Sequence, residues 1–145
     1  MDRPAFDVQE VCMVTHADFI ATMNFARLTT LARDTVATTQ ASLPAAIRGL
    51  ARAVPVHLAS APDQHLVNEG FEADILGLFT GPAHGEEPGM DNLLPPQIFL
   101  YLDNIWDFAE GDVAVFRDEV RLTYLHELGH YLAWGEDDLA ARGLD

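Results

Sequence analysis

The chain has 145 residues, 49% of them hydrophobic and 21% charged, which is the balance of a globular domain and excludes an intrinsically disordered chain. Eight arginines, no lysine and 23 acidic residues give a formal net charge of −15. A surface of this charge repels phosphate groups, so nucleic acids and anionic membrane surfaces are not expected as partners.

The cysteine content and the N-terminal residues indicate the cellular compartment of the protein. Cys12 is the single cysteine, so an intrachain disulfide is excluded and a reducing environment is favoured. The first seven residues lack the basic stretch and apolar run of a secretory signal. No run approaches the roughly 18 apolar residues that span a bilayer. We therefore expect a cytoplasmic protein.

The N-terminal part is predicted to be helical. Residues 1–15 show no hydrophobic period and are expected to form a flexible arm, whereas residues 16–145 are expected to form a single domain. Apolar residues at helical spacing predict a helix over 16–42. Pro44 suits the first turn of a second, shorter helix over 44–50, because proline tolerates that position.

The middle of the chain changes to short apolar runs. Alternating apolar residues predict a strand over 54–58, and Pro55 indicates a sheet edge because proline cannot donate to a neighbouring strand. Residues 59–68 are expected to form a loop or turn. The apolar run 75–79 fits either a strand or a buried turn.

The C-terminal part contains the clearest elements. Glycines and prolines predict a long loop over 80–96, and β-forming residues predict a strand over 97–102. A short helix is expected over 104–110 and a long one over 113–134, with Asp112 as the helix N-cap. The expected fold class is α+β, a short sheet packed against the long helix and the N-terminal helices.

The long predicted helix carries the motif His126-Glu127-Leu128-Gly129-His130, an H-E-x-x-H pattern. Residues four apart are separated by about 40° around a helix and about 6 Å along it, so both imidazoles can reach one zinc ion. Glu127 lies on the adjoining face, where it can accept a proton from a metal-bound water without being a ligand. This spacing predicts a zinc site with its own general base.

A third zinc ligand is expected from the acidic residues that follow the motif. Glu136 is ten residues after His126, the offset at which some H-E-x-x-H proteins place their third ligand. Gly135 could end the helix and let Glu136 turn toward the metal. Asp137 is the second candidate.

The segment from His126 to Leu139, HELGHYLAWGEDDL, resembles the motif of the minimal zincin-like bacterial metallopeptidases, which are small single-domain proteins with the pattern H-E-x-x-H-x-x-G-x-x-[D/E]. Thr123, three residues before the first histidine, also matches. The resemblance runs from about Ala26 to the C-terminus. Further matching segments lie upstream: Leu43-Pro44, Ile75–Gly81 and Ile98–Tyr101.

The resemblance implies a zincin-like fold, with zinc on His126, His130 and the acidic residue at position 136, and Glu127 as the base. One position departs from the pattern, because Ala133 stands where the family has glycine. We expect the helix to run about a turn longer for this reason. The substrate is not implied.

For the remaining polar residues a structural role is the better prediction. Glu119 on the long helix is expected to pair with a neighbouring arginine, and His57 and His84 are expected at the surface and in a loop. Each of three tyrosines could donate a hydrogen bond to a reaction intermediate, and the sequence does not choose among Tyr101, Tyr124 and Tyr131.

These observations predict a zinc-dependent metallopeptidase acting on a peptide or protein substrate, with strand 97–102 holding an extended peptide. The alternative is a metal-binding interaction module without proteolysis, against which the intact Glu127 argues. Repressor-cleaving metallopeptidases take a third ligand far downstream, where this sequence has no residues, and RNA hydrolases are disfavoured by the net charge.

Overall fold

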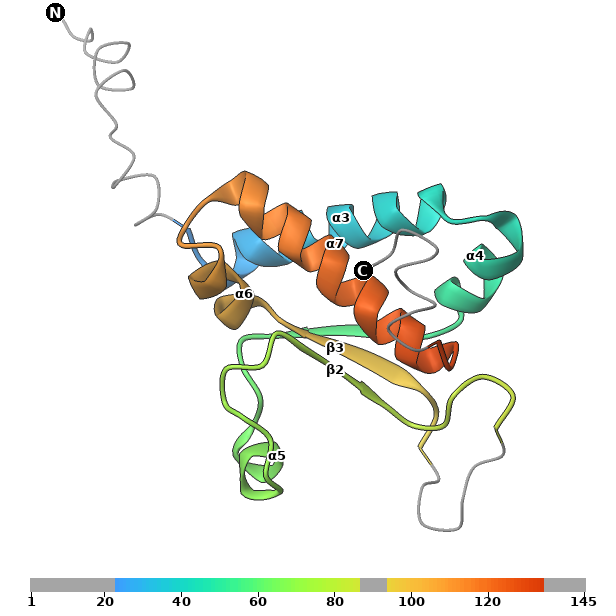
Figure 1. Ribbon diagram of the computed structural model, residues 1–145. Coiled ribbons are helices and arrows are strands. Elements are labelled where there is room, and N and C mark those ends of the chain that lie inside the picture. Colours follow the sequence, from blue (N-terminus) through green and yellow to red (C-terminus); the bar gives the residue numbers. More distant parts are fainter. Residues whose placement is uncertain (1–22, 87–93, 135–145) are drawn as a thin grey trace, which may run out of the picture.

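The computed structural model describes residues 23–86 and 94–134, and these form an α+β fold, as predicted (Figure 1). The described part contains five helices and three strands. In chain order they are α3 (Phe25–Ser42), α4 (Ala45–Arg52), β1 (Val56–Ala59), α5 (Gln64–Asn68), β2 (Gly77–Thr80), β3 (Gln97–Tyr101), α6 (Leu102–Phe108) and α7 (Val113–Tyr131). The predicted arm, residues 1–15, lies outside the described residues.

The three strands form one sheet in the order β1-β3-β2. β1 pairs with β3 in parallel and β2 pairs with β3 antiparallel, with Leu100 opposite both Leu58 and Gly77. The edge position predicted for residues 54–58 is confirmed. The prediction that strand 97–102 holds an extended peptide is wrong, because β3 is the central strand and both of its edges are already paired. Among the strands that the structure describes, the free edges of this sheet belong to β1 and β2.

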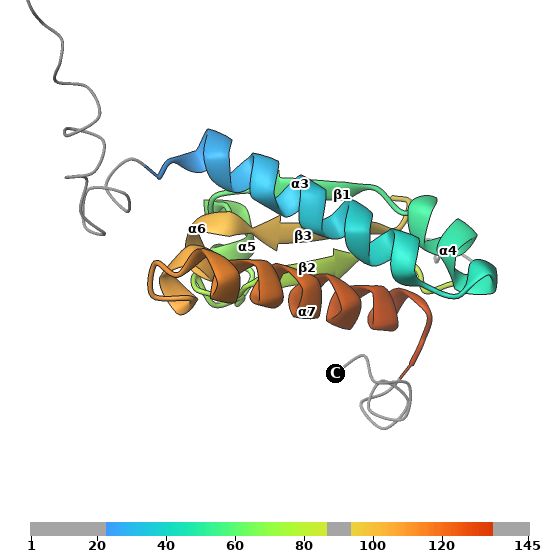
Figure 2. The same cartoon turned by 90° about the horizontal axis from the view of Figure 1, so that it is seen from above.

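Helices α3 and α7 lie side by side over one face of the sheet (Figures 1 and 2). Apolar side chains from both helices meet the inward-facing residues of β3 to form the core, because Ile98 and Leu100 alternate onto the same face. The largest fully buried side chains are Tyr101, Tyr124, Phe116, Ile98, Leu100, Leu102, Ile105, Leu125, Leu128 and Val120. Four of these ten belong to α7 before the motif, so this helix is anchored in the core.

Side-chain caps fix the beginnings of the two long helices. The side chain of Asn24 accepts a hydrogen bond from the Arg27 backbone N–H, so α3 begins at Phe25. The helix predicted from residue 16 therefore has a boundary at Asn24, and residues 16–22 lie outside the described part. Asp112 caps α7 through the backbone N–H of Val115 at 3.0 Å, as predicted.

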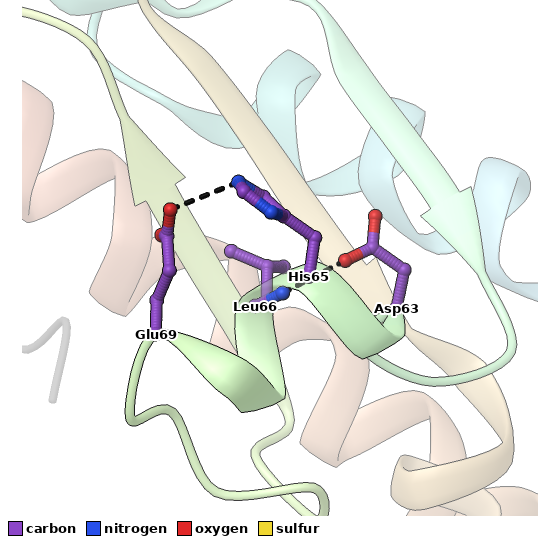
Figure 3. Close-up of polar contacts among 4 residues, drawn as sticks. All are labelled: Asp63, His65, Leu66 and Glu69. Atoms are coloured by element: carbon purple, nitrogen blue, oxygen red, sulfur yellow. Dashed lines mark hydrogen bonds and ion pairs between the residues drawn. The ribbon is translucent and has the colours of Figure 1, made fainter.

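Helix α5 occupies a segment that was predicted as a loop (Figure 3). The Asp63 carboxylate accepts a hydrogen bond from the Leu66 backbone N–H at 2.9 Å and starts this short helix. One turn apart, His65 and Glu69 form a contact of 2.9 Å between largely exposed side chains. An exposed pair of this kind stabilises little, so the cap is the main local cause of the helix.

Helix α7 ends at Tyr131, earlier than the predicted end at Trp134. Ala133 adopts a left-handed backbone conformation with φ +60°. Its N–H donates to the His130 carbonyl at 3.1 Å, and the Trp134 N–H donates to the Gly129 carbonyl at 2.8 Å. These two bonds form a Schellman C-cap. The chain therefore turns where the zincin-like pattern has glycine, although alanine occupies the position.

Ala133→Gly is expected to stabilise the protein by about 1 kcal/mol, because glycine adopts a positive φ without the steric cost that a Cβ brings. The gain is measured as the change in the free energy of unfolding in urea. Gly49→Ala is a control with the reverse substitution. Gly49 lies inside α4, where a Cβ meets no atom within 4 Å and where alanine is a better helix former than glycine. A destabilised Ala133→Gly variant would contradict the cap.

No helix in the described ranges is both long enough and apolar enough to cross a membrane.

Candidate metal centre

His126 and His130 lie next to each other on α7 near its C-terminal end. Their Nε2 atoms are 3.1 Å apart, and the ring centroids are separated by 4.8 Å with the planes at 70°. Two imidazole nitrogens that bind one tetrahedral zinc at about 2.0–2.1 Å must lie about 3.3 Å apart. The two nitrogens therefore have the separation that a shared zinc ion requires.

The third ligand predicted from the sequence, Glu136, lies outside the described residues, as does Asp137. Within the ranges that the structure describes, no group of three His, Cys, Asp or Glu side chains gathers in a metal-binding arrangement. The chain turns at Ala133, two residues before the Gly135 turn that the sequence predicted. Ala133 lies three residues after His130, at the position of the glycine in the pattern H-E-x-x-H-x-x-G-x-x-[D/E].

Glu127 is almost completely buried, with 8% of its surface exposed. Burial raises the pKa of its carboxyl group, while His126, His130 and a hydrogen bond with the Phe79 backbone lower it less. The net direction is upward, so Glu127 holds a proton more readily than an exposed glutamate does. A carboxylate with a raised pKa is a better general base near neutral pH.

Gly77, the first residue of β2, allows the sheet to approach the motif closely. A Cβ at this position would lie 2.6 Å from Thr123 Cγ2, 3.0 Å from the Phe99 carbonyl oxygen and 3.4 Å from Glu127 Cγ. Gly77 was not predicted from the sequence as a site residue. The signal was available, because a glycine within an apolar strand often marks a close backbone approach.

Gly77→Ala is expected to separate β2 from α7 and to destabilise the protein by about 1–3 kcal/mol, because the new methyl group overlaps Thr123. Gly77→Ala combined with Thr123→Ser, which removes the clashing Cγ2, should recover part of that loss. The free energies of unfolding of both variants test this contact. Equal stability of wild type and Gly77→Ala would contradict it.

The loop that follows β2 is attached to the end of α7. The His84 backbone N–H donates to the Tyr131 carbonyl at 2.6 Å, and the Tyr131 hydroxyl lies 3.4 Å from His84 Nδ1. The Tyr131 ring also packs on Phe79 with a centroid distance of 5.9 Å. His84 is therefore not only a loop histidine, as predicted, but a contact between the β2 loop and the end of α7 that carries the two motif histidines.

The structure also places the other histidine and tyrosine candidates in different surroundings. His57 stacks on Phe99 with ring centroids 5.0 Å apart, and it does not join the histidine pair. Tyr124 accepts a hydrogen bond from Gln40 on α3 at 3.0 Å, which identifies it as a core residue between two helices. The Tyr101 hydroxyl is buried at the end of β3, and within the described residues no hydrogen-bond partner is found for it.

A cleft of about 390 Å³ opens beside the motif, between α7 and the start of β2. A volume of this size is typical of small-ligand sites. It is lined by Ile75, Leu76, Gly77, Leu122, Thr123, His126 and Glu127. The cleft brings the first histidine and the buried glutamate together with apolar walls.

A family model described as zincin-like metallopeptidase matches residues 32–144 of the chain. No curated protein matches the sequence.

Proposed function

Because the chain belongs to the zincin-like metallopeptidase family, we propose that it hydrolyses peptide bonds with a zinc ion held by His126, His130 and Glu136. The observation that carries this proposal is the 3.1 Å separation of the two Nε2 atoms directly beside the buried Glu127. The bound zinc would polarise the scissile carbonyl group and lower the pKa of a coordinated water.

Glu127 is the general base in this proposal. Its carboxylate takes the proton of the attacking water and later delivers it to the leaving amine. Burial supports this role, because it raises the pKa of the carboxyl group toward neutral pH. The hydrogen bond with the Phe79 backbone fixes one side of the carboxylate, so β2 orients the base.

The free edge of β2 is the best place for an extended peptide. Leu76 accepts a hydrogen bond from the Tyr101 N–H through its carbonyl, so alternate residues of β2 face β3. Gly77 and Phe79 then direct their backbone groups to the opposite side. The Phe79 bond with Glu127 agrees with this direction. Because the Phe79 group is bonded to Glu127, a peptide would pair with this edge through Gly77 and place its backbone next to the motif.

The proposal is tested by digesting a denatured protein mixture and identifying new termini by mass spectrometry. We expect cleavage by the zinc-loaded protein, its loss in the presence of a zinc chelator, and its return when zinc is restored. Zinc-loaded protein that cleaves no peptide in the mixture would overturn the hydrolase proposal. It would leave the metal-binding interaction module as the function.

A further inference from the structure

A second cavity lies on the face of the sheet that is turned away from α3 and α7. Its volume is about 390 Å³, which is typical of small-ligand sites. The described wall residues belong to the three strands, to α5 and to adjoining loops, and they include Asp63, His65, Leu66, Leu78, Phe99 and Tyr101. Figure 1 shows α5 on this side of the sheet, and Figure 3 shows the side chains of Asp63 and His65 over the strands. We call this space the outer cavity.

Aromatic rings form the floor of the outer cavity. Ile98 and Leu100 face the core, so Phe99 and Tyr101 alternate onto the opposite face of β3. Their ring centroids are 6.4 Å apart with the planes at 13°. Leu66 of α5 also lines the cavity, as do apolar residues of β2. The lower part of the cavity therefore suits the apolar part of a ligand.

The Tyr101 hydroxyl is a polar group in this apolar wall. Only 2% of Tyr101 is exposed, and within the described residues its hydroxyl oxygen has no hydrogen-bond partner. Burial raises the pKa of this hydroxyl, and the carboxylates of Asp63 and Glu127 raise it further, so the group stays protonated and neutral. A buried hydroxyl without a partner is unfavourable, and its oxygen can accept a hydrogen bond from a ligand.

Asp63 gives the outer cavity a negative charge. Its Oδ1 accepts the hydrogen bond of the α5 cap from the Leu66 N–H, which leaves Oδ2 for another donor. No arginine is among the described wall residues, and the chain has no lysine. The His65 ring contacts Glu69 at 2.9 Å. A cation is therefore favoured in the outer cavity, as the formal net charge of −15 also favours a basic partner.

Polar side chains at one end of the outer cavity suit a peptide. Thr80 and Gln97 are opposite each other where β2 ends and β3 begins, and both line the cavity. A hydroxyl and a side-chain amide can each donate to a peptide carbonyl and accept from a peptide N–H. A ligand with peptide groups beside its side chain would therefore find partners there.

We propose that the outer cavity binds the side chain of an arginine on a peptide or protein partner. A guanidinium group has five N–H donors and no acceptor, which suits a site that offers the Asp63 carboxylate and the Tyr101 oxygen. The apolar stem of arginine packs on the apolar wall. The inference does not depend on the proposed peptidase function, because no residue of the H-E-x-x-H motif lines the outer cavity.

The proposal is tested by calorimetric titration of the zinc-loaded protein with blocked tripeptides. The central residue is arginine, citrulline or glutamate, and both neighbours are glycine. Citrulline has nearly the shape of arginine without its charge, so we expect the arginine peptide to bind about tenfold more tightly. The glutamate peptide should not bind measurably. An excess of acetohydroxamate, which would occupy a metal ion at the motif, should not displace the arginine peptide.

Propylguanidine distinguishes a peptide partner from a small molecule, because it has the arginine side chain without peptide groups. We expect it to bind several-fold more weakly than the arginine peptide. Binding of propylguanidine as tight as that of the peptide would overturn the peptide partner and assign the outer cavity to a small guanidinium compound.

Asp63→Asn removes the charge and keeps an oxygen that can cap α5. It should lower the affinity for the arginine peptide about tenfold, to that of the citrulline peptide. Asp74→Asn is the matched control, because Asp74 is an exposed carboxylate that does not line the outer cavity. This control should bind the arginine peptide as the wild type does.

Tyr101→Phe removes only the buried hydroxyl. We expect several-fold weaker binding of the arginine peptide, with a Tm equal to or above that of the wild type, because a hydroxyl without a partner is lost. A hydroxyl with a purely structural role would give the opposite result, a lower Tm and an unchanged Kd.

Three results would overturn the proposed arginine site. They are equal Kd values for the arginine and citrulline peptides, displacement of the arginine peptide by acetohydroxamate, and wild-type affinity in both Asp63→Asn and Tyr101→Phe. Each of them would leave the hydrolase proposal in place, because peptide cleavage is measured separately. Absence of cleavage would likewise leave the arginine site in place.

Discussion

Glu127→Gln is expected to lower kcat for peptide hydrolysis by about 10²–10⁴-fold, the usual contribution of a general base. The amide has the size of the carboxyl group but cannot take a proton from water. Zinc binding should persist, because the two histidines are unchanged. The measurement is kcat on a cleaved peptide, together with zinc content per chain.

Glu119→Gln is the matched control for this substitution. Glu119 lies two turns earlier on α7, is only partly buried, and does not line the cleft beside the motif. Its substitution should leave kcat near the wild-type value. If Glu127→Gln retained wild-type kcat, another group would have to act as the base, and the proposed chemistry would be wrong.

His126→Ala is expected to weaken zinc binding by at least about 100-fold, because even changes to groups that only support a ligand cost 10–100-fold. Zinc affinity is measured by competition with a chelating dye. His57→Ala controls for the loss of any histidine, since His57 stacks on Phe99 and is separate from the pair. Equal affinities of wild type and His126→Ala would remove His126 from the site.

The same titration tests the third ligand. Glu136→Ala should weaken zinc binding clearly more than Asp137→Ala does. The reverse order would move the ligand by one residue and leave the histidine pair in place.

The sequence alone was sufficient to predict the helices and strands whose buried apolar residues follow a regular spacing. The strand over 97–102 and the long helix from residue 113 were predicted close to their observed bounds, because β-formers and the Asp112 cap are local signals. The spacing of His126 and His130 likewise predicted that their side chains meet, since residues four apart on a helix are neighbours.

The errors have non-local or steric causes. Strand order depends on contacts between distant segments, so the central position of β3 could not be read from residues 97–102 themselves. The close approach of Gly77 to Thr123 depends on packing between β2 and α7. The early end of α7 at Tyr131 required alanine in a conformation that usually selects glycine, so residue preference predicted the wrong end.

The most direct test of the metal centre is the metal content of the protein without a histidine tag, after dialysis against equal concentrations of zinc, manganese and magnesium. Two imidazoles favour zinc over metals that prefer oxygen ligands, so we expect close to one zinc per chain. The His126→Ala variant should retain almost none. A wild-type protein that binds no zinc under these conditions would contradict the metal centre and the hydrolase proposed from it.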